Sequence, residues 1–198
     1  LEQVVQGKWN RDEFGRMYIA QQDFTNVLQQ VSQLVNAQKF PEALAALDAQ
    51  IKKSPPEEIA ARYAAIKQQV KLMGGMIDAE VTAFVQEQLA AGKGEPVNVA
   101  RVAMSLYQSA QQQEGLDELV KLAITALQQE VEGADQELKP LLLDTTARLQ
   151  QSVGDLEGAI ESQQAAVDSA SGSTKDRLTR FLDELKAAKD NAQAESKE

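Results

Sequence analysis

One spacing constrains the fold of this chain more than any other feature of its sequence. Four small or apolar residues with similar surroundings recur along the chain, at Ala43, Val81, Leu119 and Ala159. Their positions differ by 38, 38 and 40 residues, and each lies on the apolar side of a segment that resembles the second helix of a pair. A single helix pair cannot bury its own apolar face, so a pair repeated at this interval stacks on its neighbours. The spacing therefore predicts a helical solenoid.

Apolar residues elsewhere follow the period of an α-helix and not that of a strand. Val27, Val31 and Leu34 form one such stripe, and no Asn-Gly or Asp-Gly turn joins alternating runs. Gly and Pro residues divide the periodic segments. We expect helices near 11–37, 41–53, 57–73, 77–91, 96–113, 116–131, 136–153, 156–170 and 174–189. The predicted fold is all-α, a right-handed solenoid of about four antiparallel helix pairs. A C-terminal capping helix would cover the last pair with Leu178, Phe181, Leu182 and Leu185.

Two of these pairs resemble tetratricopeptide (TPR) repeats. The residues that carry the likeness are Phe40, Ala43, Leu47 and Pro55 in the first pair, and Gly154, Leu156, Ala159 and Ala166 in the last. Gln50 departs from the family pattern, no repeat carries the hallmark Trp, and the interval exceeds the family's 34 residues. The resemblance covers roughly residues 20–190. It implies a non-catalytic module for protein–protein interaction or self-association.

Composition excludes most enzyme chemistry for this chain. It has no His and no Cys, so a Ser-His-Asp triad, a Cys-His pair, a CxxC redox pair and a conventional zinc site are all excluded. We expect no catalytic residues, no cofactor and no metal. The net charge of −10 disfavours nucleic acid as a partner, and no apolar run is long enough to insert in a membrane. The expected partner is a protein, a peptide or another copy of the chain.

The concave face of a TPR-like solenoid, lined by the first helix of each pair, is the surface on which we expect a partner to bind. Polar residues that lie off the apolar stripes of these helices are the candidate contacts. They are Thr25, Ser32, Asn36, Arg101, Gln108, Asp144, Arg148 and Gln151. A solvated groove without a partner is the alternative for these residues.

The first ten residues, LEQVVQGKWN, resemble the end of the last helix of thioredoxin-like (TlpA or redoxin type) proteins. That resemblance implies a second function, in which this chain is the C-terminal accessory domain of a thiol–disulfide oxidoreductase with its redox site upstream. It would also imply an extracytoplasmic or periplasmic location, which nothing else in the sequence indicates. Trp9, the only Trp, is expected to pack against the first helix pair or to be left exposed.

The predicted organisation has three parts. Residues 1–10 are read as the remnant of a preceding domain or a linker helix, and residues 11–189 as the TPR-like repeat domain. Residues 190–198 are polar with small apolar side chains, which predicts a disordered tail.

Overall fold

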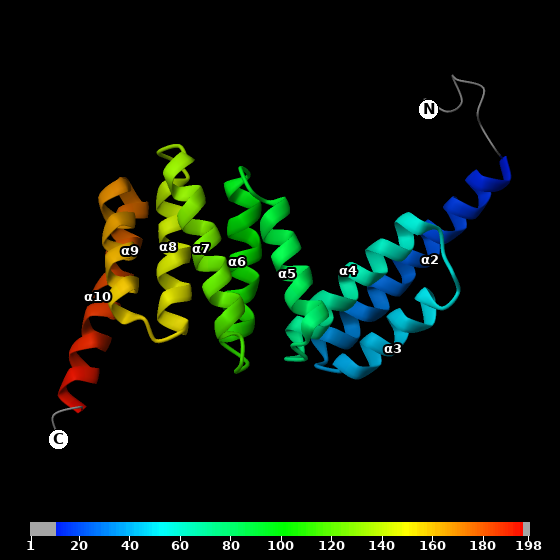
Figure 1. Ribbon diagram of the computed structural model, residues 1–198, viewed down its shortest axis with the longest axis horizontal. Coiled ribbons are helices and arrows are strands. Elements are labelled where there is room, and N and C mark those ends of the chain that lie inside the picture. Colours follow the sequence, from blue (N-terminus) through cyan, green and yellow to red (C-terminus); the bar gives the residue numbers. More distant parts are fainter. Residues whose placement is uncertain (1–10, 196–198) are drawn as a thin grey trace. The chain divides into compact units, whose positions relative to one another are not determined.

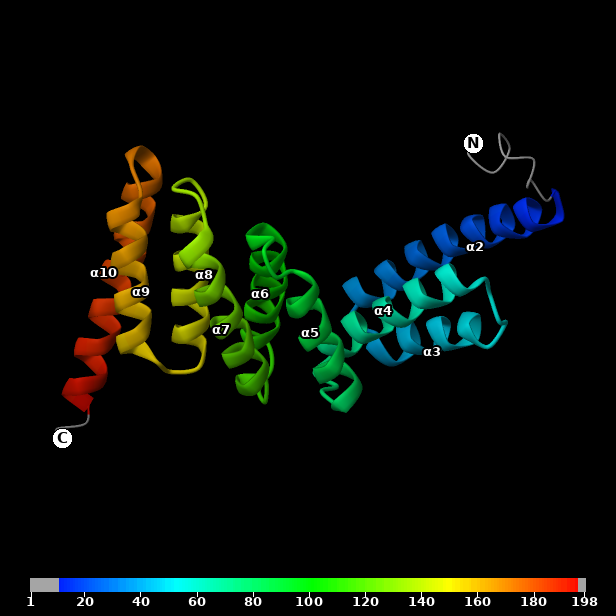
Figure 2. The ribbon, with the colours of Figure 1, turned by 45° about the horizontal axis from the view of Figure 1, so that its top comes forward.

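A computed structural model describes residues 11–195 of the chain, and this part is all-α (Figures 1 and 2). Of the described residues, 82% are helical and none is in a strand. The helices are α2 (Arg11–Asn36), α3 (Phe40–Ile51), α4 (Glu57–Met73), α5 (Ala79–Ala91), α6 (Pro96–Ala110), α7 (Asp117–Gly133), α8 (Lys139–Ser152), α9 (Leu156–Ser169) and α10 (Gly172–Glu195). Each of the nine predicted helices is present in the described residues, so the all-α prediction is confirmed.

A side-chain cap explains why α5 begins two residues later than predicted. Helix α5 begins at Ala79 because the carboxylate of Asp78 accepts a hydrogen bond of 2.9 Å from the Val81 amide, which fixes Asp78 as the N-cap. Helix α8 begins at Lys139 and has no side-chain cap at its N-cap residue, Leu138; the Asp135 carboxylate accepts hydrogen bonds from the amides of Glu137 and Leu138 in the turn before it.

The last helix is longer than predicted. Helix α10 continues to Glu195, so residues 190–195 are helical where we expected a disordered tail, and residues 196–198 lie outside the described part. Lys189 near the end of α10 is 2.7 Å from the Glu157 carboxylate of α9, which ties the extended helix to its neighbour. The last four residues of this segment, Ala192, Gln193, Ala194 and Glu195, are themselves good helix formers.

The chain divides into two compact units, with the boundary between Met76 and Ile77, where we expected one repeat domain. In the first unit α2, α3 and α4 contact one another. Its core consists of Phe24, Val27, Val31, Ala43, Leu47, Ile59, Tyr63 and Val70. The Phe24 and Tyr63 rings lie 5.1 Å apart and tilted, the arrangement that aromatic pairs favour.

In the second unit each helix from α5 to α10 contacts the next, as Figure 1 also shows. Alternate helices touch as well, α5 with α7 and α6 with α8. At the C-terminal end, α10 covers α9 with Leu178, Phe181, Leu182 and Leu185, all buried, as predicted for the capping helix. The side-chain amide of the buried Gln163 in α9 donates a 3.0 Å hydrogen bond to the Leu178 carbonyl of α10.

The four residues that define the repeat are all buried. Ala43, Val81 and Ala159 are 0% exposed and Leu119 is 2% exposed. Their burial agrees with the apolar side on which the sequence places them, and their arrangement as repeated helix pairs stays a prediction.

Burial of Tyr63 leads to a prediction on alkaline stability. Burial, with a smaller contribution from the Asp23 carboxylate, raises the pKa of Tyr63 above its ordinary value of 10.0. The folded state thus favours the neutral phenol of Tyr63. Its contribution to the free energy of unfolding is fully present below pH 10 and is lost as pH rises through the raised pKa. We expect a phenolate absorbance step above pH 10 that is missing from Tyr63→Phe. If the absorbance step assigned to Tyr63 had its midpoint at or below pH 10, Tyr63 would not be buried in solution.

Candidate interaction face

The eight predicted contact residues fall in both units. Thr25, Ser32 and Asn36 lie on α2 and are exposed, and their spacing places them on one side of the helix. The Thr25 hydroxyl donates to the Gln21 carbonyl one turn earlier. The other five residues belong to α6 and α8 of the second unit.

On α6, Arg101 and Gln108 are exposed, as a contact role requires. Arg101 donates a 3.2 Å hydrogen bond to the Asn98 side chain, which in turn donates to the Glu95 carboxylate. Asn98 and Arg101 follow Pro96, which occupies the first turn of α6 where its missing N–H removes no helical hydrogen bond.

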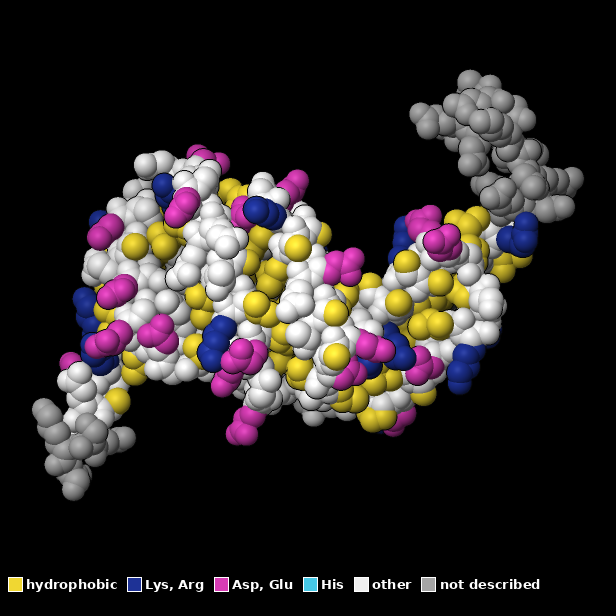
Figure 3. All heavy atoms as spheres, in the orientation of Figure 1, with side chains coloured by type: hydrophobic (Ala, Val, Ile, Leu, Met, Phe, Trp, Pro, Cys, Tyr) yellow, Lys and Arg dark blue, Asp and Glu magenta, His cyan; other side chains and the backbone are white. Residues whose placement is uncertain are grey.

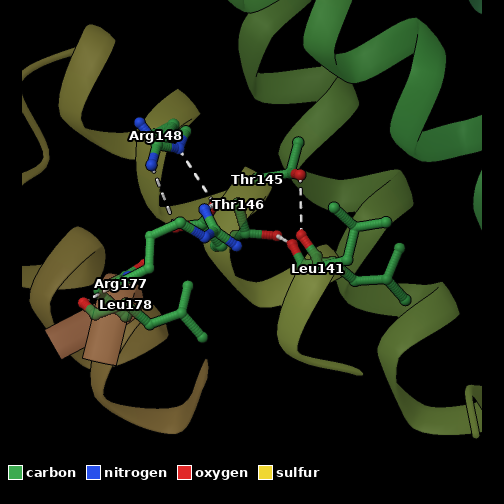
Figure 4. Close-up of polar contacts among 9 residues, drawn as sticks. Leu141, Thr145, Thr146, Arg148, Arg177 and Leu178 are labelled. Atoms are coloured by element: carbon green, nitrogen blue, oxygen red, sulfur yellow. Dashed lines mark hydrogen bonds and ion pairs between the residues drawn. The ribbon is translucent and has the colours of Figure 1, made fainter. Parts of the chain in front are cut away.

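On α8 the prediction needs a correction. Asp144 is only 3% exposed, so it offers almost no surface to a partner. It is buried because two arginines surround its carboxylate. Arg148, one turn later, lies with Nε 3.1 Å from Oδ2 and Nη2 3.4 Å from Oδ1, and Nη1 of Arg177 from α10 lies 3.6 Å from Oδ2 (Figure 4). Asp144 therefore positions two cations that are themselves partly exposed.

Arg148 lies at the centre of this cluster. Its guanidinium carbon is 4.3 Å from the centre of the Phe181 ring, a cation–π distance. Burial alone would lower the pKa of Arg148. Its interactions with Asp144 and with Tyr107 of α6 outweigh burial, so the pKa is raised and the side chain stays charged. One residue thus links α6, α8 and α10.

Other polar side chains of α8 are satisfied within the helix. The hydroxyls of the buried Thr145 and Thr146 donate to the carbonyls of Leu141 and Leu142, at 2.8 and 2.9 Å (Figure 4). Gln150 is also buried, and its side-chain oxygen accepts a 2.7 Å hydrogen bond from Ser162 of α9. Gln151, by contrast, is half-buried and remains accessible as a contact residue.

The sequence predicts Phe181 as part of the capping helix, and it singles out neither Tyr107 nor Arg177 as a contact. A four-residue spacing of Asp144 and Arg148 signals an ion pair on one helix. It gives no indication that α10 supplies a second arginine.

Among residues 11–195, no group of three or more Asp or Glu side chains could hold a metal ion together. No described helix is long and apolar enough to cross a membrane. An arginine fixed by a buried carboxylate and an aromatic ring can donate its remaining N–H groups to an acceptor on a partner.

No protein-family model, curated protein or solved structure matches the chain. The TPR-like resemblance therefore rests on the residues quoted for it. The thioredoxin-like resemblance rests on residues 1–10, which lie outside the described part of the chain.

Proposed function

We propose that the chain is a non-catalytic protein–protein interaction or self-association module, built of TPR-like helix pairs in a right-handed solenoid. The observation that carries the proposal is a pair of large apolar side chains in the first turns of two helices that touch. Val97 of α6 is 56% exposed and Leu141 of α8 is 43% exposed. An exposed Val or Leu in the first turn does not stabilise the helix itself. A partner that covers these two side chains would explain why they are apolar.

Helical spacing links these two residues with the predicted contacts. Val97, Arg101 and Gln108 are four and seven residues apart, which places them on one side of α6. Leu141 and Arg148 are seven residues apart on α8 and share a side in the same way. The combined face offers exposed apolar groups beside arginines, a composition enriched at the centre of protein interfaces.

The contact between α6 and α8 supports the TPR-like arrangement, because in an array of helix pairs the first helices of successive pairs line one surface. The contact of α5 with α7 supports it for the second helices. Buried small or apolar residues at the repeat interval are the third support.

Glutamate at both Val97 and Leu141 tests the proposal. Desolvating two carboxylates in an interface should weaken association at least about tenfold. The matched control is the double variant Tyr18→Glu and Met73→Glu, which alters two equally exposed apolar residues of the other unit.

Two measurements cover the two kinds of partner. Sedimentation velocity over a range of concentrations reports self-association. A photo-crosslinker at Arg101 reports a different partner in cells that produce the chain. The proposal predicts an oligomer or a discrete adduct that is lost in the Val97/Leu141 variant and kept in the control. A monomer at all concentrations, with no adduct that depends on these residues, would refute it.

A further inference from the structure

The three-helix unit contains a cleft that the proposed interaction face does not include. Its volume is about 520 Å³, within the range of about 300–1,000 Å³ that is typical of small-molecule sites. Its walls come from the first half of α2, the end of α3 with its connection to α4, and the start of α4.

The inner wall of the cleft is apolar. Ile59 and Tyr63 are 1% and 2% exposed and belong to the core of the unit, and Met17, Ala20 and Pro55 line the cleft beside them. In Figure 3, hydrophobic side chains of this unit reach the surface among acidic and basic ones. An aliphatic group of a ligand can therefore leave water against this wall, which is favourable.

Three charged side chains also line the cleft, Arg16, Asp23 and Lys53. All three are exposed, and within residues 11–195 none of them belongs to an ion pair. A charged group that has no partner of its own and lies beside an apolar wall can pair with a ligand of opposite charge.

The two signs of charge are separated along α2. Arg16 and Asp23 are seven residues apart, which places them on one side of the helix and about 10 Å apart along its axis. Asp23 contributes to the raised pKa of Tyr63, so its carboxylate lies within electrostatic reach of the buried phenol. No hydrogen bond links the Tyr63 hydroxyl to another described residue. Asp23 and Tyr63 thus form an acidic end of the cleft, two turns from Arg16.

We propose that this cleft binds a short peptide of about three residues with both ends free and an aliphatic side chain between them. The ammonium group of the peptide pairs with Asp23 and donates to the Tyr63 hydroxyl, and the carboxylate pairs with Arg16. An extended chain of three residues spans about 10 Å, which matches the separation of Arg16 and Asp23. A single amino acid is too short, because both of its charged groups are attached to one Cα atom.

The remaining polar residues of the lining suit a peptide. Gln50 and Ser54 lie in the wall and can donate to or accept from its peptide groups, and Lys53 adds a second cation for its carboxylate. The aliphatic side chain lies against Ile59. The proposal does not depend on the proposed function, which concerns α6 and α8.

Isothermal titration calorimetry of the 198-residue chain with the tripeptide Ala-Leu-Ala measures the binding. Acetylating its amino end, or amidating its carboxyl end, should each weaken binding about threefold to fivefold, the effect expected for a pair of solvent-exposed charges. The uncharged-end peptides are the same length and keep the Leu side chain, so they change only the charges.

Variants of the chain show which residue reads which end. Asp23→Asn should weaken the free peptide about threefold to fivefold and leave the acetylated peptide unchanged. Arg16→Gln combined with Lys53→Gln should weaken the free peptide at least as much and leave the amidated peptide unchanged. Lys52→Gln is the matched control, because Lys52 is exposed beside Lys53 but does not line the cleft, and it should change neither. Far-ultraviolet circular dichroism verifies that each variant stays helical.

Four results would overturn the proposal. Absence of binding at millimolar Ala-Leu-Ala would mean that the cleft takes no such peptide. Equal binding of the free and blocked peptides would mean that the ends are not recognised. Binding that both charge variants leave unchanged would mean that the peptide lies elsewhere. An equal loss for the free and the acetylated peptide in Asp23→Asn would mean that Asp23 does not pair with the ammonium group. None of these results bears on Val97 and Leu141, so the proposed function stands or falls separately.

Discussion

Replacing Ala159 by Arg should lower the free energy of unfolding of the chain by more than about 3 kcal/mol. Ala159 is 0% exposed and packs with Ala147, Phe181 and Leu185, where α8, α9 and α10 meet. Enlarging a side chain in a well-packed contact costs about 1–3 kcal/mol, and burying a guanidinium without a partner adds to that. Urea denaturation followed by circular dichroism measures the change as a lower midpoint.

The same helix supplies the control. Ala165 is exposed, so Ala165→Arg makes the same chemical change on α9 without entering the contact. Its effect should stay within about 0.5 kcal/mol, as for other surface substitutions. If the two variants had equal midpoints, Ala159 would not lie at a close approach of helices, and the assignment of repeat positions would be wrong.

Burial is predicted well in this chain wherever it follows from local periodicity or from the repetition of that periodicity. The stripe of Val27 and Val31 is buried, and so are the four repeat residues, because a helix face with apolar residues at period 3.6 has few ways to avoid water other than packing. Apart from the C-terminal end of α10, helix ends were predicted within about three residues, because Pro and Gly act locally. The Asp78 cap shifted the start of α5, and a turn that includes Asp135 precedes the later start of α8.

The division into two units was not predicted, and it falls just after Gly74 and Gly75. In the sequence these two glycines are among the Gly and Pro residues that divide the periodic segments. A Cβ on Gly74 would meet the Phe40 side chain at 2.9 Å, so this position has to be small for packing within the first unit. Sequence alone does not distinguish a glycine that serves packing from one that serves a turn.

The polar cluster of α8 is a second feature that the sequence does not predict. Asp144 and Arg148 are four residues apart, but the groups that bury them, Arg177 and Phe181, come more than 28 residues later. Gly158 is similar, since a Cβ there would collide with Asp155 and come within 2.6 Å of the Gln150 side chain. Contacts between helices decide these features, and periodicity within one helix carries no information about them.

Asp144→Ala should be the other strongly destabilising change, with an expected loss of about 2–3 kcal/mol. The substitution leaves the Arg148 guanidinium, 25% exposed, with Phe181 and Tyr107 but without its counter-ion. Removing one member of a buried ion pair costs about 3–5 kcal/mol, and partial access of Arg148 to water reduces that figure. Urea denaturation again gives the measurement.

The control for this change is an ion pair of the same kind at the surface. Glu118 and Lys121 of α7 are 2.9 Å apart, with side chains 87% and 60% exposed. Glu118→Ala should therefore change stability by less than about 1 kcal/mol, because water solvates the lysine that remains. An equal loss in the two variants would mean that burial adds nothing to the Asp144 pair.

A double-mutant cycle separates the interaction from the cost of an unpaired charge. Arg148→Met alone leaves the Asp144 carboxylate buried with only Arg177 at 3.6 Å, so it too should be strongly destabilising. The double variant Asp144→Ala with Arg148→Met buries no unpaired charge at this site, so its loss should be smaller than the sum of the two single losses. Additive losses would mean that Asp144 and Arg148 act independently. In that case Arg148 would be held in place by Phe181 and Tyr107 alone, and Asp144 would have no part in positioning it at the candidate interaction face.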